Sequence, residues 1–207
     1  MMREFWNSRY SEKEYAYGTE PNAFFKSALT ELKLKGNILF PAEGEGRNAV
    51  FAAKMGLNVS AFDLSEEGKN KAEKLAQFNK VQINYSLGEL TEHAYQENSF
   101  DAIVLIFAHL PPPIRPKMHQ QLSKLLKPNG IILLEGFSKK QLAFQKTNTL
   151  AGGPQNLEML FSTDEILSDF DGFEIIQLTE ETVNLNEGNY HQGESSVIRF
   201  IGRKMKG

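Results

Sequence analysis

Hydrophobic residues fall along this chain in two kinds of pattern. Short segments rich in apolar residues, which suit buried strands better than helices, occur over residues 38–40, 57–62, 81–85, 100–107 and 131–137. Between them, apolar residues at helical spacing predict helices over residues 22–32, 47–55, 65–79, 115–126 and 163–170. Alternating strands and helices predict an α/β fold, Rossmann-like and doubly wound around a mostly parallel sheet.

The C-terminal part of the chain has a different pattern. Residues 173–185 and 195–203 each alternate between apolar and polar positions, which predicts two half-buried strands. Because no helix separates them, they are expected to pair antiparallel through the loop 186–193. The parallel sheet is therefore predicted to end in an antiparallel C-terminal hairpin.

A chain of 207 residues is most simply a single domain, spanning residues 1–207. Residues 1–30 carry aromatic side chains at helical spacing and are expected to form an N-terminal aromatic helical cap. Residues 138–158 are polar and irregular, which is typical either of a lid loop or of a disordered segment. The helix over 65–79 is expected to bury Phe78 together with its smaller apolar neighbours.

One stretch combines the elements of a nucleotide-binding unit. The first strand is followed by the small-residue loop 42–46, a helix, a second strand and then Asp63. In such βαβ units the glycine-rich loop lets the backbone approach the ligand, and the acid accepts hydrogen bonds from ribose hydroxyls. The sequence therefore predicts that a nucleotide-containing cofactor binds at this loop.

The acids of this loop bear on which cofactor it binds. Gly44, Gly46 and Ala49 fit G-x-G-x-x-A, which alone would allow NAD. However, Glu43 and Glu45 stand where a dinucleotide would place its pyrophosphate, and like charges in a partly desolvated loop oppose each other by ~1 kcal/mol or more. S-adenosylmethionine carries an ammonium and a sulfonium that these acids would attract, so the loop favours this methyl donor.

Candidate residues also follow the other predicted strands, whose carboxyl ends meet at one edge of the sheet. Glu89 is expected either to accept a hydrogen bond from an adenine amino group or to be a solvated loop acid. His109 leaves the central strand and is the first candidate for a catalytic base, with His191 as the second. A lone histidine is more often structural, and His93 and His119 are expected at the surface.

Substrate contacts are predicted near the mouth of the site. Tyr17 in the N-terminal cap and Tyr190 in the last loop are the aromatic candidates. Arg9 is expected either to bind an anionic substrate or to form a salt bridge. Glu135, within the fifth strand, is expected either to be an acid at the core edge with a partner or to face the site.

Composition narrows the class of protein. The net charge is −3, so no basic footprint for nucleic acid is visible, and no apolar run approaches the ~20 residues that cross a bilayer. The absence of cysteine excludes disulfides, thiolate zinc sites and a cysteine nucleophile. A soluble cytoplasmic protein that binds neither nucleic acid nor membrane is expected, and the oligomeric state stays open.

Five stretches in order resemble class I S-adenosylmethionine-dependent methyltransferases, in particular the tellurite-resistance and thiopurine methyltransferase-like subgroup. They are the amino-terminal FWNSRY with YAYGTEPN, then EGEGRNAVFAA, AFDLS and FAHLPP, and the terminal EGNYHQG with SSVIRFIGRK. The resemblance implies a seven-stranded sheet and direct in-line methyl transfer without a metal. It also implies donor-binding roles: Gly44 and Gly46 would approach the methionine end, and Asp63 would take the ribose hydroxyls. Leu64 would pack on the adenine, Glu89 and Leu90 would bind the adenine amino group and ring edge, and Phe107 and Ala108 would lie beside the sulfonium.

The chain departs from the family pattern at the first strand. The family usually ends this strand with an acid, followed after one residue by glycine, where this chain has Phe40 and Ala42. Glu43 is therefore inferred to supply the missing charge to the donor's ammonium. Ala42 is expected to keep a negative φ and to change the path of the loop.

The activity expected from these features is methyl transfer from S-adenosylmethionine to a small-molecule acceptor. A thiol, a selenol, a tellurium oxyanion and a planar heterocycle all stay open as acceptors. Two alternatives also stay open: an NAD-dependent oxidoreductase, and a protein that binds S-adenosylmethionine without catalysis.

Overall fold

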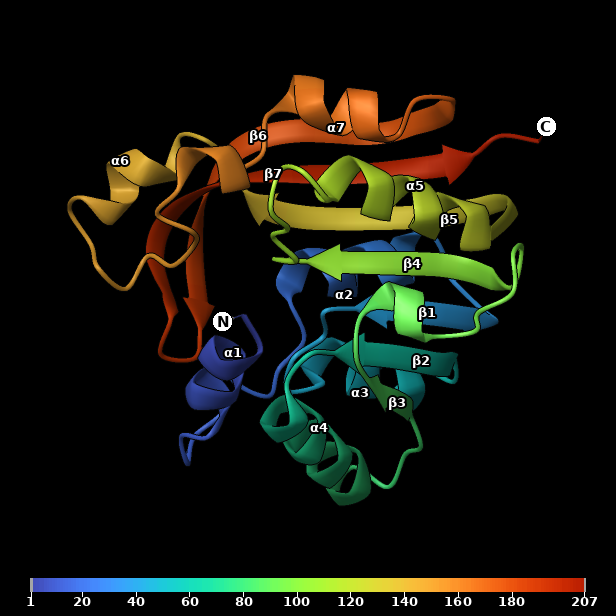
Figure 1. Cartoon of the computed structure of the whole chain (residues 1–207), viewed down its shortest axis with the longest axis horizontal. Coiled ribbons are helices and arrows are strands. Elements are labelled where there is room, and N and C mark those ends of the chain that lie inside the picture. The colour runs from blue at the N-terminus through green and yellow to red at the C-terminus, as the bar shows by residue number, and fades with distance from the viewer. Residues whose placement is uncertain (1, 207) are drawn as a thin grey trace.

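The computed structural model describes residues 2–206 and confirms the predicted α/β architecture. Within this range one seven-stranded sheet has the order β3-β2-β1-β4-β5-β7-β6 (Figure 1). The strands are β1 Asn37–Pro41, β2 Asn58–Asp63, β3 Asn84–Leu87, β4 Phe100–Ile106, β5 Leu126–Phe137, β6 Phe173–Glu187 and β7 His191–Lys204. The helices are α1 Met2–Tyr10, α2 Ala23–Glu31, α3 Arg47–Lys54, α4 Glu66–Phe78, α5 Arg115–Leu125, α6 Gln141–Gln145 and α7 Thr163–Asp169, with short 3₁₀ helices η1 Leu90–Glu92 and η2 Leu157–Met159.

The direction of the strands creates a ligand crevice at one place in the sheet. Strands β1 to β5 pair in parallel, and β1 lies between β2 on one side and β4 on the other. In open α/β sheets the crevice opens where the strand order reverses, beyond the carboxyl ends of the strands. Here that point lies between β1 and β4.

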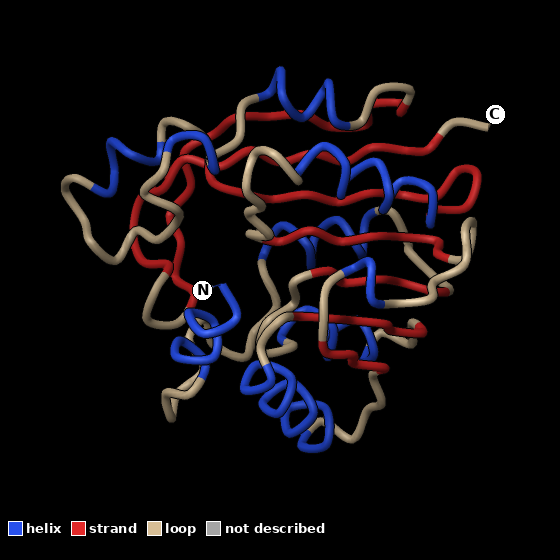
Figure 2. Tube along the Cα trace, in the orientation of Figure 1, coloured by secondary structure: helices blue, strands red, loops and turns tan. Residues whose placement is uncertain are grey.

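Helices cover both faces of the sheet (Figure 2). On one face, α2 and α3 pack residues such as Phe25 and Ala52 against Phe40 of β1. On the other face, α5 and α7 pack residues such as Leu122 and Ile166 against the central strands. None of the helices in residues 2–206 combines the length and the apolarity that crossing a membrane requires.

The predicted antiparallel hairpin is present, and it is longer than expected. β6 extends to Glu187 and β7 begins at His191, so the turn comprises residues 188–190 rather than 186–193. β7 also pairs antiparallel with β5, which attaches the hairpin to the parallel part of the sheet. Glu187 and His191 are direct partners across the hairpin. Both side chains therefore lie at its tip.

The expected burial of Phe78 is wrong, since this side chain is 84% exposed. The buried face of α4 runs through Ala72, Leu75 and Ala76. At 100° per residue, the next position on this face falls after the end of the helix, and Phe78 points outside it.

Candidate functional site

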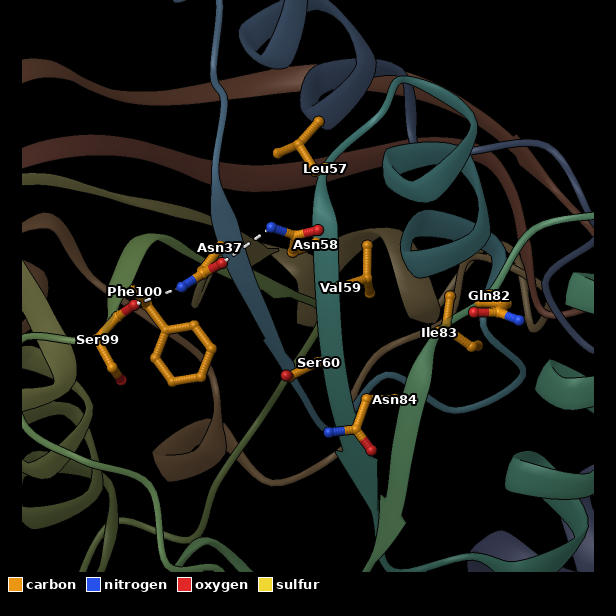
Figure 3. A pocket seen from close by; sticks show the side chains of 10 residues that line it. All are labelled: Asn37, Leu57, Asn58, Val59, Ser60, Gln82, Ile83, Asn84, Ser99 and Phe100. Carbon is orange, nitrogen blue, oxygen red and sulfur yellow. Dashed lines mark hydrogen bonds between the residues drawn. The ribbon is translucent and has the colours of Figure 1, made fainter.

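The predicted site residues lie at the carboxyl ends of the parallel strands. Figure 1 shows that α1, α6 and the bent ends of β6 and β7 gather at this edge of the sheet. A separate pocket lies at the opposite edge, at the amino ends of β1, β2 and β3, and is lined by amide side chains such as Asn37, Asn58 and Asn84 (Figure 3). Because ligands of open α/β sheets bind beyond the carboxyl ends, the first edge is the candidate site.

The loop after β1 keeps the tight path of a glycine-rich loop. The expected negative φ at Ala42 is wrong, because Ala42 adopts φ +52°. A left-handed alanine costs about 1–2 kcal/mol, which the surrounding loop contacts must offset. Gly46 has φ +84°, and a Cβ atom there would lie 2.5 Å from the Cβ of Ala72 in α4. Glycine at this position thus lets the loop pack directly on α4.

Asp63 ends β2 beside this loop. Its Oδ2 accepts a hydrogen bond from the backbone N–H of Gly44 at 2.9 Å, and its Oδ1 accepts one from the N–H of Ser65 at 2.8 Å. Burial raises the pKa of the carboxyl, and these backbone donors oppose that rise. Because a carboxylate offers about four acceptor positions, the two bonds leave room for ribose hydroxyls. The arrangement of Asp63 therefore fits a nucleoside.

The two loop acids have different surroundings. Glu43 Oε1 accepts hydrogen bonds from the N–H groups of Asn48 and Ala49, at 2.9 and 2.8 Å, and so caps the first turn of α3. Burial raises the pKa of Glu43 to about 7, although these amides act against the rise. Glu45 instead pairs with Lys71 at 2.8 Å and accepts from the N–H of Ala16 at 2.7 Å. Glu45 therefore holds the N-terminal segment, and Glu43 is the acid whose charge a bound cation can change.

Two tyrosines that the sequence did not single out enclose the loop. Tyr85 donates to the carbonyl oxygen of Gly44 at 2.6 Å, and Tyr10 of α1 lies against Gly44 and Gly68. The Asn7 side chain of α1 also accepts a hydrogen bond from the Ser65 hydroxyl at 2.7 Å. Helix α1 thus covers the loop, and Tyr10 is the contact that the aromatic spacing of α1 could have indicated.

The residues predicted to contact adenine lie after β2 and β3. Leu64 is half-buried, Leu90 is buried, and Glu89 is exposed. The side chain of Glu92 accepts a hydrogen bond from the N–H of Glu89 at 2.6 Å, which fixes the backbone of this turn. The exposed carboxylate of Glu89 is compatible with either of the roles that the sequence left open.

Phe107 and Ala108 follow β4, next to the crevice. Phe107 has φ +52°, an uncommon conformation for a bulky residue, and its N–H donates to the carbonyl of Glu135 at 2.7 Å. Its ring contacts the rings of Phe137 and His191, with centroid distances of 4.5 and 4.4 Å. Local strain of this kind is characteristic of functional sites.

Both ring nitrogens of His109 are bound to the backbone. Nδ1 lies 2.8 Å from the carbonyl oxygen of Met159, and Nε2 accepts a hydrogen bond from the N–H of Phe137 at 3.0 Å. Since a carbonyl can only accept and an N–H can only donate, the proton is on Nδ1. Desolvation lowers the pKa of His109 to about 4. The arrangement occupies the lone pair that a base would need.

We expect His109→Ala to destabilise the fold by about 2–4 kcal/mol, because it removes both hydrogen bonds and the stacking on Phe161. Chemical denaturation measures the loss of unfolding free energy, and calorimetry with S-adenosylhomocysteine should show an affinity within a few-fold of wild type. A variant of unchanged stability that had lost turnover would instead restore His109 as the base.

The surface position expected for His119 is wrong. This ring is fully buried, and its Nδ1 lies 2.8 Å from Asp169, which also accepts a hydrogen bond from Arg115 at 3.0 Å. His119 lies on the face of α5 that packs on α7, where the cation of Arg115 and the carboxylate of Asp169 compensate each other. Alternating polar residues in a short helix do not reveal such a partner in a distant segment.

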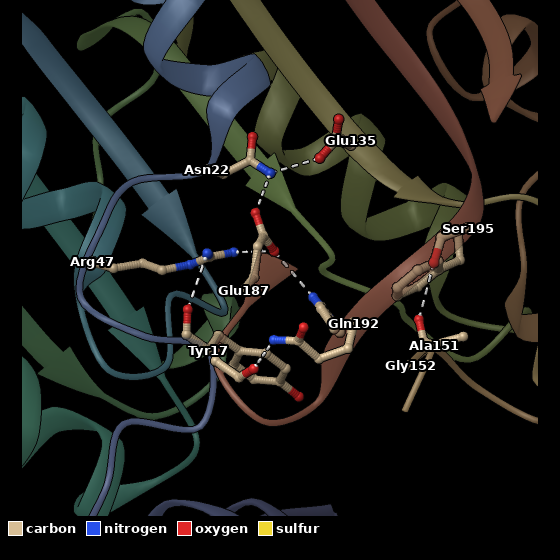
Figure 4. Close-up of polar contacts among 12 residues, drawn as sticks. Tyr17, Asn22, Arg47, Glu135, Ala151, Gly152, Glu187, Gln192 and Ser195 are labelled. Atoms are coloured by element: carbon tan, nitrogen blue, oxygen red, sulfur yellow. Dashed lines mark hydrogen bonds and ion pairs between the residues drawn. The ribbon is translucent and has the colours of Figure 1, made fainter. Parts of the chain in front are cut away.

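His191 contacts Glu187, which belongs to a buried polar network with Arg47, Asn22 and Glu135 (Figure 4). Its Nδ1 lies 3.1 Å from Glu187 Oε2, and the same oxygen accepts a hydrogen bond from Arg47 at 2.8 Å. Asn22 donates to Glu187 Oε1 at 2.9 Å and to Glu135 at 2.6 Å. Although burial opposes ionisation, the hydrogen bond from His191 and the Arg47 cation lower the pKa of Glu187 to about 2. Arg47, Glu187 and Asn22 were not predicted as site residues.

Glu135 is the acid at the core edge with a partner, the first of its two predicted roles. It is fully buried, and its Oε2 accepts a hydrogen bond from Arg199 of β7 at 2.5 Å. Burial raises the pKa of Glu135, and Arg199 opposes that rise. The pair lies directly behind Asn22, so it supports the network from the side of the sheet.

The three predicted substrate contacts lie together. The guanidinium of Arg9 stacks on Tyr190, 3.6 Å from the ring centroid, and it donates to the Tyr17 hydroxyl at 3.4 Å. The Tyr190 hydroxyl in turn donates to Glu12. The Tyr17 ring packs on His191 with a centroid distance of 4.4 Å. Arg9 therefore joins α1 to the hairpin tip, in contact with both aromatic candidates.

Comparison with known proteins gives a domain and a fold. Residues 38–130 match the family model described as "Methyltransferase domain". No match was found among curated protein sequences. Among solved structures, one described for the conversion of a disulfide bond into a thioacetal group during echinomycin biosynthesis is similar with a TM-score of 0.81 and 15% identity, over 99% of this chain and 92% of that chain.

Two further structures are similar over most of this chain. A protein from Methanosarcina mazei, described among SAM-dependent methyltransferases, has a TM-score of 0.70 and 18% identity over 91% of this chain and all of its own. TehB from Haemophilus influenzae has a TM-score of 0.69 and 16% identity, over 98% of this chain and 66% of TehB. At these identities the likeness shows the fold.

Proposed function

We propose that the chain uses S-adenosylmethionine as its cofactor and transfers a methyl group directly to a small-molecule acceptor, because residues 38–130 match the model of a methyltransferase domain. The cofactor supplies an electrophilic methyl group on a positively charged sulfur. The work left to the protein is to bind the donor, align the acceptor in line and exclude water. One observation carries this proposal. The Asp63 carboxylate and the Gly44 loop meet at the same strand ends as the aromatic cluster around Phe107.

The donor would lie across the carboxyl ends of β1, β2 and β3. Asp63 takes the ribose hydroxyls, and Glu43 takes the ammonium in place of the acid that Phe40 replaces. The remaining donor contacts keep the roles that the family resemblance implies, with the loop glycines Gly44 and Gly46 at the methionine end, Leu64, Glu89 and Leu90 at the adenine, and Phe107 and Ala108 beside the sulfonium. Glu45, paired with Lys71, acts on this site by holding the loop.

The acceptor is proposed to be small and partly apolar. Tyr17 and Tyr190 provide ring surfaces at the mouth, and Arg9 provides a cation that is already stacked between α1 and the hairpin. The fold likeness to a protein that acts in echinomycin biosynthesis supports a small molecule. The likeness to TehB, with the sequence resemblance above, supports the tellurite-resistance and thiopurine methyltransferase-like subgroup.

Calorimetry followed by a transfer assay tests this function. The protein should bind S-adenosylhomocysteine with micromolar-range affinity and should bind NAD much more weakly. Screening small acceptors with a methyl-labelled donor should then identify labelled product. Tight NAD binding without S-adenosylhomocysteine binding would make the chain an oxidoreductase, and donor binding without transfer to any acceptor would make it a non-catalytic binder.

Donor binding is expected to strengthen as the pH rises through 7. The pKa of Glu43 is raised to about 7 in the free protein, so a large part of this carboxyl is protonated at neutral pH. A bound ammonium favours the ionised form, and donor binding must therefore release a proton. Calorimetry of wild type between pH 6 and 8, in buffers of different ionisation enthalpy, measures this release. Glu43→Gln should bind more weakly and lose most of the pH dependence, whereas an unchanged pH dependence would remove Glu43 from the donor site.

A further inference from the structure

We propose that Glu187 holds His191 as the proton acceptor of the methyl-acceptor site, and that the chain therefore methylates a neutral hydroxyl or thiol. This inference rests on the proposed methyl transfer and adds two things to it: a base with its positioning residue, and the chemical class of the acceptor.

The geometry of His191 is that of an oriented base. Glu187 can only accept, so the ring proton is on Nδ1 and the lone pair is on Nε2. Nε2 makes no hydrogen bond to any residue between 2 and 206. Within residues 2–206, the buried side-chain nitrogen atoms that lack a hydrogen-bond partner belong to His93, Arg115 and His119. Nε2 of His191 is not among them, so it keeps some contact with solvent. This lone pair, unlike that of His109, is available to a proton.

Aromatic rings place this lone pair next to the predicted path of the methyl group. The ring of Phe107, which directly follows β4, packs edge-on against the ring of His191, with a centroid distance of 4.4 Å. The rings of Tyr17 and Phe137 also contact the imidazole, with centroid distances of 4.4 and 5.0 Å. A planar, apolar acceptor matches these walls, and its O–H or S–H group would be the polar part that meets Nε2.

The loop at Gly152 packs closely against the ring edge of His191. A Cβ atom on Gly152 would lie 2.4 Å from the Cδ2 of His191 and 3.1 Å from its Nε2, and Gly152 has φ +78°. Gln141 and Gln145 hold this loop by donating to the carbonyl of Gly152 at 3.2 and 2.8 Å. Glycine at this position therefore keeps a side chain away from the proposed base, within a loop that is otherwise firmly bonded.

Both oxygens of Glu187 are fixed from outside the hairpin. Arg47 binds Oε2 and Asn22 binds Oε1, so the carboxylate cannot rotate away from His191 without losing a partner. Arg47 is the first residue of α3, directly after Gly46 of the donor loop. The donor loop and the proposed base are thus joined by one salt bridge, in which Glu187 is the positioning residue.

Burial of the ring favours the neutral form of His191 at pH 7. Burial lowers the pKa of the imidazole, and Arg47 of α3 and Arg9 of α1 act in the same direction. Glu187 of β6 opposes them through its hydrogen bond and charge. The other titratable groups that face the ring are Tyr17 and His109, and His109 is neutral. A neutral His191 can accept a proton, and Glu187 then stabilises the imidazolium that forms.

Methyl transfer to a neutral hydroxyl or thiol requires one proton acceptor, which His191 provides. As the acceptor oxygen or sulfur attacks, its electron pair forms the bond to the methyl carbon, and the carbon–sulfur bond of the donor breaks with its pair left on sulfur. The acceptor proton moves to Nε2 of His191. The imidazolium then releases this proton to solvent after the products leave.

Nuclear magnetic resonance of ¹⁵N-histidine-labelled protein, with S-adenosylhomocysteine bound, tests the base without turnover. We expect the Nδ1–H tautomer of His191 at pH 7 and titration below the usual 6.5. Because Glu187 raises the pKa of His191, Glu187→Gln should lower it further, and Glu174→Gln, an exposed acid on the same strand, should not change it. A charged imidazole or an Nε2–H tautomer at pH 7 would overturn the proposal.

A panel of phenols and thiophenols of graded acidity tests the acceptor class. His191→Gln should lose about 10²- to 10⁴-fold in turnover with members that are protonated at the assay pH, and less than about tenfold with members that are already ionised. Glu187→Gln should move the acid limb of the kcat profile to lower pH, while the affinity for S-adenosylhomocysteine stays within about threefold.

The outcomes separate this inference from the function on which it rests. An equal loss with protonated and ionised acceptors would overturn His191 as the base. Normal binding of S-adenosylhomocysteine with no transfer to any member of the panel would overturn the acceptor class. A wild-type protein that failed to bind S-adenosylhomocysteine would instead contradict the proposed function. If Glu187→Gln does not fold, the tautomer of His191 in the wild-type protein and the His191→Gln measurements still test whether His191 is the base.

Discussion

Replacing Asp63 by alanine is expected to weaken S-adenosylhomocysteine binding by about 100-fold or more. A carboxylate that accepts two ribose hydroxyls makes two charge-assisted hydrogen bonds, and the pair contributes about 3 kcal/mol. The substitution also removes the acceptor for the N–H groups of Gly44 and Ser65, which hold the loop and the start of α4. Both effects act in the same direction on donor affinity. Titration calorimetry measures the change directly.

Asp101→Ala is the matched control for this variant. Asp101 lies in β4 near the opposite edge of the sheet, where it pairs with Lys127 at 2.8 Å and accepts from the N–H of Asn37. Its removal should lower stability slightly and leave the donor affinity unchanged. If Asp63→Ala remained folded and bound S-adenosylhomocysteine as tightly as wild type, the end of β2 would not be the ribose site.

The elements that the sequence predicted well are those with a local signal. A run such as 100–107, apolar except for Asp101, predicts a central strand, and β4 spans Phe100–Ile106. The Ser65 hydroxyl accepts a hydrogen bond from the N–H of Gly68, which is the capping bond that the start of a helix predicts. Strand ends then place Asp63 and Phe107 at one edge, because parallel strands share their direction.

The parts that the sequence missed depend on contacts between distant segments. Arg47 and Glu187 are 140 positions apart, and neither stands in a pattern that marks it as a partner of the other. The same holds for His119 and Asp169, 50 positions apart. Proximity of this kind follows from the curvature of the hairpin and from helix packing, which hydrophobic periodicity does not encode.

The loop conformation shows a second limit. Propensity assigns Ala42 a negative φ, but the chain must turn between β1 and α3 within a few residues. The N–H of Glu43 donates to the carbonyl of Phe62 at 3.3 Å, and the Glu43 side chain caps α3. These contacts fix the residue after Ala42. Tertiary structure therefore overrides the preference of alanine for a negative φ, at a cost of about 1–2 kcal/mol.

Arg199→Ala is expected to destabilise the fold by about 3–5 kcal/mol, which lowers the melting temperature by on the order of 10 °C. The variant leaves the fully buried Glu135 carboxylate with Asn22 and without its cation. Breaking a buried pair costs more than the pair contributed, because the remaining charge has no solvent to stabilise it. Thermal and chemical denaturation measure the loss.

The pH dependence of this loss has a definite sign. Burial already raises the pKa of Glu135 in wild type, and removal of the Arg199 cation raises it further. A carboxyl whose folded-state pKa is raised favours the folded state while protonated and loses that advantage as the pH rises through the pKa. The difference in stability between Arg199→Ala and wild type should therefore be smaller at pH 5 than at pH 8.

Two companion variants separate burial from charge pairing. Arg203→Ala, four residues along the same strand, breaks an exposed pair with Glu174 at 2.9 Å and should cost less than about 1 kcal/mol. Replacing both buried partners, by Glu135→Leu with Arg199→Met, should recover most of the stability lost in Arg199→Ala, since it removes the isolated charge. A double variant as unstable as Arg199→Ala would show that the fold requires the polar network itself, because Asn22 would then have lost a partner that apolar packing cannot replace.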